Sequence, residues 1–325
     1  MRFSLIFSLL SLAGLSIQED YSNPLKKTQG SDPFIVTDLG YYYLLTSTWS
    51  DVHITRAKTL EGLKTGEKKV VYRSEEIARC CYLWSPELWK IDGIWYLYFT
   101  AGTKESLDGQ RVHVLTGGQS PFDDYTYTAQ LTPKWGIDAT IFRTPEKNYL
   151  VWSGIAMWQS LFIAELLTPS TITSPTLLSE PTIPWEQVRN PVNEGPAALY
   201  AGGKSYLTYS ASDCWSPDYQ LGLLTWDGVT DPLRADGWTK SGPIMNSANG
   251  NFGTGHNGFF TSFDQSETWI VYHATSKPTG NCGAMRYTMA QKMNFNGEGT
   301  PIWPVIAPPL NETLPGPAGE DIELH

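Results

Sequence analysis

Short runs of aromatic and β-branched residues recur along the whole chain, and a turn ends each run. Aromatic runs occur at residues 41–47, 94–100, 148–154, 205–211 and 269–274. Each is followed by another strand-like run, at residues 52–59, 111–116, 161–167, 221–226 and 286–295. Turn dipeptides such as Asp92-Gly93 and Asp227-Gly228 separate the runs. Because no stretch of a dozen residues keeps apolar positions at helical spacing without Gly or Pro, the pattern predicts an all-β chain.

Five short polar motifs precede the aromatic runs at nearly even spacing. They are Ser31-Asp32-Pro33, Trp84-Ser85-Pro86-Glu87, Gly136-Ile137-Asp138-Ala139, Asn193-Glu194-Gly195-Pro196 and Gly255-His256-Asn257. The polar residues Asp32, Glu87, Asp138, Glu194 and His256 follow one another at intervals of 51 to 62 residues. A repeat of this length is about the size of one four-stranded blade, so the chain is predicted to be a five-bladed β-propeller.

The repeat also predicts where these polar residues lie. The first strand of each propeller blade lines the central channel, and each motif stands at the head of such a strand. We therefore expect the five polar residues at one end of one funnel. Crowded carboxyl groups push each other's pKa values apart, which supplies an acid and a base at the same pH, as glycoside hydrolysis requires. A lone Asp-Pro is usually a turn, but five coincident motifs are hard to explain as turn chemistry.

The composition narrows the classes of partner. The formal net charge of −10 disfavours nucleic acid and anionic membranes. Aromatic residues make up 13% of the chain, with 13 Trp and 17 Tyr. These rings suit packing between sheets as well as stacking on sugar rings, and both uses are expected, of different residues.

The N-terminus predicts export. Arg2, an apolar run at residues 3–15 and small residues near Ser16 form the pattern of a signal peptide, which we place at residues 1–17. The alternative is an uncleaved membrane anchor, although the apolar run is too short to span a bilayer. A single propeller domain is expected over residues 18–325, because no long polar linker divides the chain. The mature protein is expected to be secreted and monomeric.

The cysteines fit an oxidising compartment. Cys80, Cys81, Cys214 and Cys282 allow three pairings, one of which joins the neighbours Cys80 and Cys81, and the sequence does not choose among them. No C-x-x-C pair occurs, which argues against a structural zinc site. Asn311 begins the one N-glycosylation sequon.

The motifs, taken in order, carry a family resemblance. Together with residues 83–88, 92–99, 136–140 and 192–197, the segment Ser31-Asp32-Pro33-Phe34 resembles glycoside hydrolase family 43 over nearly all of the mature chain. The resemblance implies a five-bladed propeller that hydrolyses glycosides with inversion and requires no cofactor. It implies Asp32 as the general base, Glu194 as the general acid, and Asp138 as a third acid that raises the pKa of Glu194 and orients it.

The resemblance also implies roles for residues around these acids. Trp84 is a candidate platform for a sugar ring or a packing residue, and Glu87 binds a sugar hydroxyl or anchors backbone. Ser85 stands where the family often has Ala. His256 matches a channel histidine beneath the active site, where calcium or sodium is a candidate ligand through water; a structural histidine is the alternative. Arg286 matches an arginine that reaches the substrate or the acids, and a surface arginine is the alternative.

Finer segments indicate the sugar. Residues 56–60, 184–186, 207–212, 219–224 and 238–241 resemble the branch of exo-acting α-L-arabinofuranosidases, whose partner is the α-1,5-arabinan of plant cell walls. Trp158 and Trp215, in the loop-rich segments 152–159 and 213–218, are expected to wall the pocket for a terminal sugar, or else to pack at blade edges.

Other functions stay open at this point. An endo-arabinanase or a β-xylosidase of the same family is the main alternative. A retaining fructosidase would need an Asn-Asp-Pro-Asn motif, which Ser31-Asp32-Pro33-Phe34 does not supply. A non-catalytic sugar-binding propeller would repeat its sites between blades, whereas this chain collects one non-equivalent set of acids at its hub.

Overall fold

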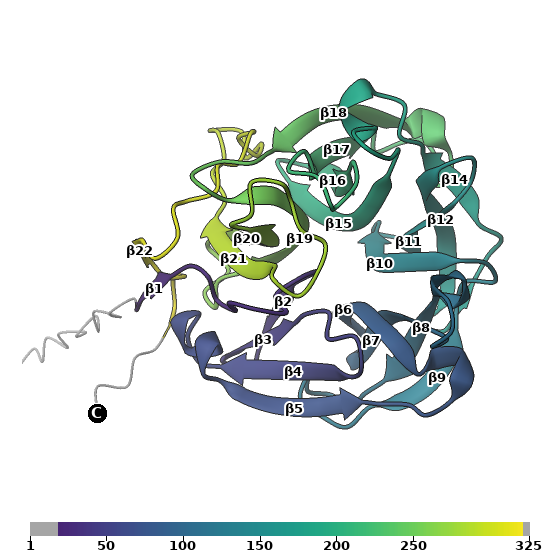
Figure 1. The fold of residues 1–325 in the computed structure, drawn as a ribbon, viewed down its shortest axis with the longest axis horizontal. Coiled ribbons are helices and arrows are strands. Elements are labelled where there is room, and N and C mark those ends of the chain that lie inside the picture. Colours follow the sequence, from purple (N-terminus) through teal and green to yellow (C-terminus); the bar gives the residue numbers. More distant parts are fainter. Residues whose placement is uncertain (1–18, 321–325) are drawn as a thin grey trace, which may run out of the picture.

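The computed structural model describes residues 19–320. Five antiparallel sheets stand around a central axis like the blades of a propeller, each with its first strand innermost (Figure 1). Neighbouring innermost strands contact one another around the ring. The predicted five-bladed β-propeller is therefore confirmed, and the expected signal peptide at residues 1–17 lies outside the described residues.

The strands of each blade follow one another in sequence from the axis outward. Blade 1 comprises β2 (Phe34–Asp38), β3 (Tyr41–Leu45), β4 (Val52–Ala57) and β5 (Glu67–Tyr72). Blade 2 comprises β6 (Cys81–Ile91), β7 (Ile94–Gly102), β8 (Arg111–Thr116) and β9 (Thr126–Gln130). Blade 3 comprises β10 (Gly136–Arg143), β11 (Asn148–Ile155) and β12 (Gln159–Thr168), with the short strands β13 (Thr171–Ile172) and β14 (Thr176–Ser179) both paired to β12.

The last two blades follow the same order. Blade 4 comprises β15 (Asn193–Ala201), β16 (Lys204–Ala211), β17 (Gln220–Trp226) and β18 (Trp238–Met245). Blade 5 comprises β19 (Phe252–Thr261), β20 (Thr268–Thr275) and β21 (Tyr287–Lys292). The predicted runs thus correspond to the second and third strands of every blade.

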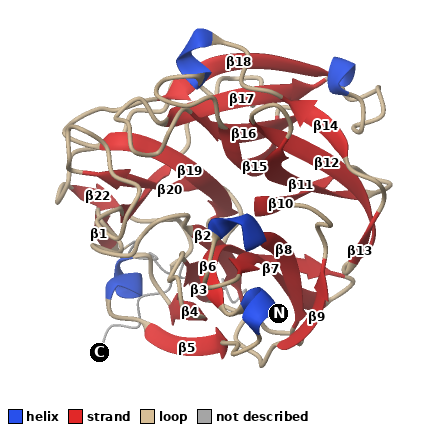
Figure 2. Cartoon of the chain, turned by 45° about the vertical axis from the view of Figure 1, so that its right-hand side comes forward, coloured by secondary structure: helices blue, strands red, loops and turns tan. Residues whose placement is uncertain are grey.

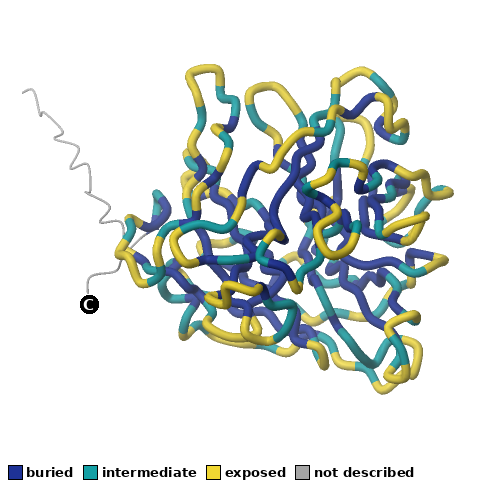
Figure 3. Tube along the Cα trace, turned by 45° about the horizontal axis from the view of Figure 1, so that its top comes forward, coloured by how far each residue is buried: buried dark blue, intermediate teal, exposed yellow. Residues whose placement is uncertain are grey.

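The hydrophobic core is divided into five clusters, one between each pair of neighbouring blades. Leu45 and Leu97, for example, belong to the cluster between blades 1 and 2, and Leu221 and Tyr272 belong to the cluster between blades 4 and 5. Both faces of a blade are buried in this way, so its central strands are apolar on both sides. Figure 3 shows the result: buried segments run through the blades, and exposed ones gather in the connecting loops.

Helical structure is scarce, as the sequence predicts. In residues 19–320 the helices are five short 3₁₀ turns: Glu61–Lys64, Ile77–Arg79, Leu107–Gly109, Pro184–Glu186 and Ala235–Gly237 (blue in Figure 2). Within the same residues, no helix has the length and apolar character needed to cross a membrane.

The segment before β2 closes the ring by pairing with blade 5. The Leu25 amide donates to the Thr288 carbonyl at 2.9 Å, and the Thr288 amide donates to the Lys26 carbonyl at 2.9 Å. The Asn23 side chain adds two bonds to the backbone of Ala290. Farther out, β1 (Asp20–Ser22) pairs with β22 (Thr313–Pro315). The first and last parts of the chain therefore hold blade 5 against blade 1.

Two disulfides complete the described structure. Cys80 is bonded to its neighbour Cys81, and Cys214 is bonded to Cys282. The second bridge joins the loop between β16 and β17 to the loop between β20 and β21, so it ties blade 4 to blade 5. Asn311, the predicted glycosylation position, is exposed.

Candidate active site

In every blade a residue with a positive φ interrupts the innermost chain at the same end of the propeller. These residues have φ between 45° and 59°, and they are Asp32, Ser85, Asp138, Gly195 and His256. In blades 2 to 5 the strand register shifts at this point. A bulge of this kind bends the strand and re-aims a side chain. Left-handed backbone costs a non-glycine residue about 1–2 kcal/mol, and such strain clusters at functional sites.

The bulges revise which residues of the five motifs are equivalent. Ser85 and Gly195 hold the left-handed position in blades 2 and 4, whereas Glu87 lies two residues after it and Glu194 one residue before it. Glu194 still faces the channel. Glu87 does not line the pocket, because its buried carboxylate turns to the Trp89 indole nitrogen, which donates to Oε2 at 2.7 Å.

The residues expected around the acids meet at one pocket of about 420 Å³. Asp32, Asp138 and Glu194 line it, and the expected residues Trp84, Trp215, His256 and Arg286 lie in its wall. Trp158 lines an adjoining pocket of about 380 Å³ that shares Gln159, Glu194 and Cys214 with the first. Of the expected residues, only Glu87 is left out of both pockets.

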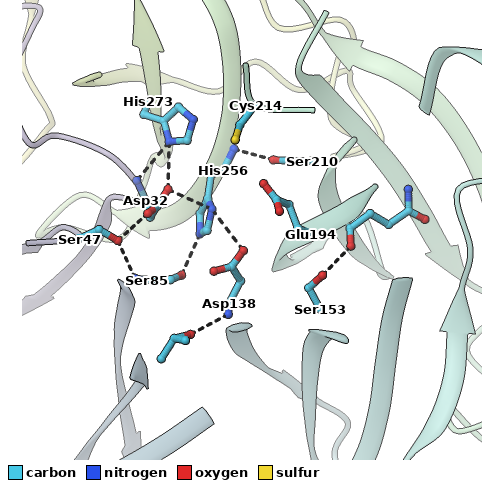
Figure 4. A network of polar contacts seen from close by, with 12 residues as sticks. Asp32, Ser47, Ser85, Asp138, Ser153, Glu194, Ser210, Cys214, His256 and His273 are labelled. Atoms are coloured by element: carbon cyan, nitrogen blue, oxygen red, sulfur yellow. Dashed lines mark hydrogen bonds and ion pairs between the residues drawn. The ribbon is translucent and has the colours of Figure 1, made fainter. Parts of the chain in front are cut away.

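Asp32 lies among cationic and polar donors. Its Oδ1 is 3.4 Å from Arg286 Nη1 and 3.3 Å from the Nδ1 atoms of both His256 and His273. Its Oδ2 accepts a hydrogen bond from Ser47 Oγ (Figure 4). Burial alone would raise the pKa of Asp32, but the nearby Arg286 charge and the two imidazoles hold that pKa well below its usual range.

His256 joins Asp32 to Ser85. The Ser85 hydroxyl is 2.9 Å from His256 Nε2, and the opposite ring nitrogen faces Asp32. Burial lowers the pKa of His256, so the ring is neutral at neutral pH. Gly195 is necessary beside this ring, because a Cβ there would lie 2.9 Å from His256 Nδ1.

Glu194 has a different set of neighbours. The Tyr219 hydroxyl donates to its Oε1 at 2.9 Å, and Gln159 Nε2 donates to its Oε2 at 2.7 Å. Burial raises the pKa of Glu194 to about 7; the charge of Asp32 acts in the same direction, and the two hydrogen bonds oppose it. The carboxyl group therefore keeps its proton through mildly acidic pH.

Asp138 lies between the other two acids. Its Oδ2 is 3.8 Å from His256 Nδ1, and its amide donates to Thr100 Oγ1 at 3.1 Å (Figure 4). Burial raises the pKa of Asp138 well above its ordinary value, and the charges of Glu194 and Asp32 raise it further. Asp138 and Glu194 together thus hold a proton that Asp32 does not.

A buried polar network anchors the strand that carries Glu194. Asn193, the residue before it, donates from Nδ2 to Glu186 Oε1 at 2.9 Å. Lys240 Nζ lies 2.8 Å from the same oxygen, and the Tyr209 hydroxyl donates to it as well. Glu186 is fully buried, and these partners satisfy its carboxyl oxygen. The network therefore fixes the backbone from which Glu194 projects.

Several site residues were not singled out from the sequence. Ser47, Gln159, Tyr219 and His273 contact the acids directly, yet they come from second and third strands or from loops rather than from the motifs. His273 had a usable signal, since it is a polar residue inside the apolar run at 269–274. The others carried none, because their partners are distant in sequence.

The site offers little to a metal ion. Both ring nitrogens of His256 have protein partners, so no free ring nitrogen faces the channel. Among the described residues, no group of three or more His, Cys, Asp or Glu is arranged to hold a metal ion. An ion bound through water near His256 stays a prediction.

Comparison with known proteins points to one family. The sequence profile described as Glycosyl hydrolases family 43 matches residues 21–301. The chain is 36% identical over 304 residues to the extracellular exo-alpha-(1->5)-L-arabinofuranosidase of Streptomyces avermitilis, covering 86% of this chain. It is 35% identical to the protein of the same name from Streptomyces chartreusis, covering 78% of this chain and 82% of that protein.

Solved structures agree with the fold. The crystal structure of an alpha-L-arabinofuranosidase from Lactobacillus brevis superposes with a TM-score of 0.82 at 32% sequence identity, covering 90% of this chain and 98% of that one. The present chain spans 62% of the length of the Streptomyces avermitilis protein, which is less than two thirds.

Proposed function

The chain belongs to glycosyl hydrolases family 43, and from this membership we propose that it releases terminal L-arabinofuranose from α-1,5-arabinan or its oligosaccharides with inversion at the anomeric carbon. The observation that carries the proposal is the contrast between two buried carboxyl groups of one pocket. The neighbours of Asp32 keep it ionised, whereas Glu194 has a pKa of about 7. A base and an acid are thus available in the same pH range.

Each acid then has one step. Glu194 gives its proton to the glycosidic oxygen as the bond from that oxygen to C1 breaks. Asp32 takes a proton from the water whose oxygen bonds to C1 on the opposite face. Asp138 acts through Glu194, because the two buried carboxyl groups compete for a proton and the ionised form of either one favours the protonated form of the other. After the products leave, Glu194 regains a proton and Asp32 loses one, which restores the starting state.

The choice of arabinofuranose and of exo action is supported by the relatives. The two Streptomyces proteins are named for exo action on α-1,5-linked arabinofuranose. Tryptophans also wall the acid pocket: Trp49, Trp84, Trp135 and Trp215 line it, which suits a single sugar ring held between apolar faces. Secretion is proposed on the same ground, since both relatives are named extracellular.

The test is digestion of linear α-1,5-arabinan with analysis of the products at early times. The proposal expects arabinose alone and a slow loss of viscosity. A ladder of oligosaccharides would make the protein an endo-arabinanase, and release of xylose from xylo-oligosaccharides in place of arabinose would make it a xylosidase. Proton NMR of the first-formed sugar decides the stereochemistry: the β anomer from an α linkage is expected, and the α anomer would overturn inversion.

A further inference from the structure

A second pocket, of about 380 Å³, lies beside the acid pocket and shares Gln159, Glu194 and Cys214 with it. Its volume is within the range of about 300–1,000 Å³ that is usual for ligand pockets. Glu194, the proposed acid, lines both pockets. Asp32, the proposed base, lines the acid pocket and not the second one. The two pockets therefore meet at the acid.

The chemistry of the proposed reaction assigns a side to each sugar. The ring that carries C1 lies between the base and the acid, because water attacks C1 on the face opposite to the leaving oxygen. That ring belongs in the acid pocket, which holds both Asp32 and Glu194. The leaving oxygen receives the proton of Glu194 and departs with the rest of the chain. The departing sugars therefore lie in space that Glu194 lines and Asp32 does not, which is the second pocket.

The turn that joins β11 to β12 forms one wall of the second pocket and is apolar. Ile155, Met157 and Trp158 line the pocket from this turn, and they are 54%, 80% and 46% exposed. Single exposed apolar residues are normal on a surface, but a group of them beside a pocket indicates a binding groove. Because nearly half of Trp158 is exposed, packing at a blade edge accounts for only part of this side chain. Its indole can take the apolar face of a sugar ring.

Hydrogen bonds hold this turn in place relative to the acid. The Trp158 carbonyl accepts from the Ala156 amide at 2.9 Å and from Ser160 Oγ at 3.1 Å. The next side chain, Gln159, donates from Nε2 to Glu194 Oε2 at 2.7 Å. Trp158 and the group that gives the proton are thus joined through one residue. A sugar on the indole is therefore held at a fixed position relative to Glu194, as efficient proton transfer requires.

Polar groups complete the second pocket. Asn190 and Asp213 line it, and Asn190 Nδ2 donates to the Asp213 carboxylate. Arg189 Nε lies 3.5 Å from the same carboxylate, so the charge of Asp213 is paired. An apolar wall beside an amide and a paired carboxylate suits a neutral ligand that has both an apolar face and hydroxyl groups. A sugar without a charged group meets this description.

We propose that the turn at residues 155–158 binds the leaving arabinofuranose unit of the oligosaccharide, with the Trp158 indole as its platform. The inference rests on the proposed function, which supplies the substrate and the side of Glu194 on which that unit departs. Trp158 is thereby assigned to the leaving-group side of the bond that breaks, whereas the sequence predicted the side of the terminal sugar. The turn then determines how strongly the enzyme prefers a chain of arabinose units to a single unit.

The experiment compares two sugars in the Asp32→Asn protein, in which binding is expected without turnover. Arabinose fills the acid pocket alone, and α-1,5-linked arabinotriose fills the second pocket as well. Adding Trp158→Ala should weaken the calorimetric binding of arabinotriose about tenfold, which is 1.4 kcal/mol, and change that of arabinose by less than about twofold. Trp158→Phe keeps an aromatic face and should retain most of the affinity for arabinotriose.

Leu167→Ala is the matched control. Leu167 is 60% exposed near the other end of β12 and lines neither pocket, so its variant should bind both sugars unchanged. Equal losses for the two sugars in Trp158→Ala would put Trp158 beside the terminal sugar and overturn the proposal, and no loss for either sugar would overturn it as well. In both cases, release of arabinose from arabinotriose by the wild type leaves the proposed function in place. Absence of that release would overturn both.

Discussion

Asp32 and Glu194 are carboxyl groups of the same pocket and both are buried, yet their surroundings differ in charge. Asp32 faces the Arg286 guanidinium at 3.4 Å and two imidazoles at 3.3 Å. Glu194 faces a phenol at 2.9 Å and an amide at 2.7 Å, both of them neutral. Burial is the largest influence on both groups and raises the pKa of each.

The difference teaches what decides the role of a buried acid. Neutral donors reduce the effect of burial without reversing it, so the pKa of Glu194 stays raised. A cation together with several donors does reverse it, so the pKa of Asp32 is lowered. The proposed acid and base are thus distinguished by the residues around them. Their positions in the sequence repeat do not distinguish them, because each lies in the polar motif at the innermost strand of its blade.

The largest expected effect comes from removing the base. Asp32→Asn cannot accept a proton from water, so we expect kcat on arabinotriose to fall by about 10⁴-fold, the upper end for general acid–base catalysis. The loss should be the same for substrates with good and poor leaving groups, because the attacking water needs the base in either case. Calorimetric binding of arabinotriose should persist. A variant with near-normal turnover would mean that another residue activates the water.

Removing the acid should give a loss that depends on the substrate. Glu194→Gln keeps both hydrogen-bonding neighbours but has no proton to donate, so we expect a loss of about 10²–10⁴-fold on arabino-oligosaccharides. On a nitrophenyl arabinofuranoside the loss should be much smaller, because that leaving group needs little protonation. Steady-state kinetics on the two substrates make the comparison. Equal losses on both would assign the proton to another group.

Removing the cation should make the surroundings of Asp32 more like those of Glu194. In Arg286→Gln the pKa of Asp32 should rise, because the effect of burial is then opposed only by the two histidines and the remaining hydrogen bonds. Since the base works only when ionised, the acidic limb of the pH profile should move to higher pH. We expect kcat/KM to fall about tenfold or more at mildly acidic pH, a factor worth 1.36 kcal/mol. Arg286→Lys is the matched control, and it should restore much of the lost activity at that pH.

The sequence predicted the fold far better than the neighbours of the acids. The run expected at 111–116 coincides with β8, and the five aromatic runs each became a second strand, because apolar periodicity reflects burial between blades. The run expected at 286–295 was too long: β21 is Tyr287–Lys292, and Arg286 stands before it, turned toward Asp32. The spacing of apolar residues does not show whether a charged residue such as Arg286 belongs to the strand or stands just before it.

The acids of the pocket were predictable because a motif itself supplied each side chain. Asp32 and Asp138 occupy the left-handed position of their motifs, and the structure brings both to the pocket. Glu87 was expected beside them and is not there, because the bulge places Ser85 at that position instead. Bulges have no signature in the spacing of apolar residues. Gln159 and Tyr219 meet Glu194 only through the arrangement of separate strands, which the sequence does not show.

The smallest expected effect sharpens the comparison from the side of Glu194. Tyr219→Phe removes the hydroxyl that donates to Oε1 and keeps the ring, which stacks on His273 with centroids 5.6 Å apart. That hydrogen bond favours the ionised carboxylate, so its loss should raise the pKa of Glu194 further. Activity falls with rising pH as Glu194 loses its proton, and a higher pKa moves this fall to higher pH.

The expected signature is therefore a displaced basic limb. At pH 8 the variant should retain a larger share of its maximal kcat/KM than the wild type. The maximum itself should drop by no more than about tenfold, because Glu194 is protonated there and a hydrogen bond between neutral groups contributes about 0.5–1.5 kcal/mol. Tyr206→Phe is the matched control, because the buried Tyr206 hydroxyl has no hydrogen-bond partner among the described residues. It should leave the profile unchanged. A basic limb that stays in place in Tyr219→Phe, or moves to lower pH, would show that the Tyr219 hydroxyl does not set the ionisation of the acid that limits the rate.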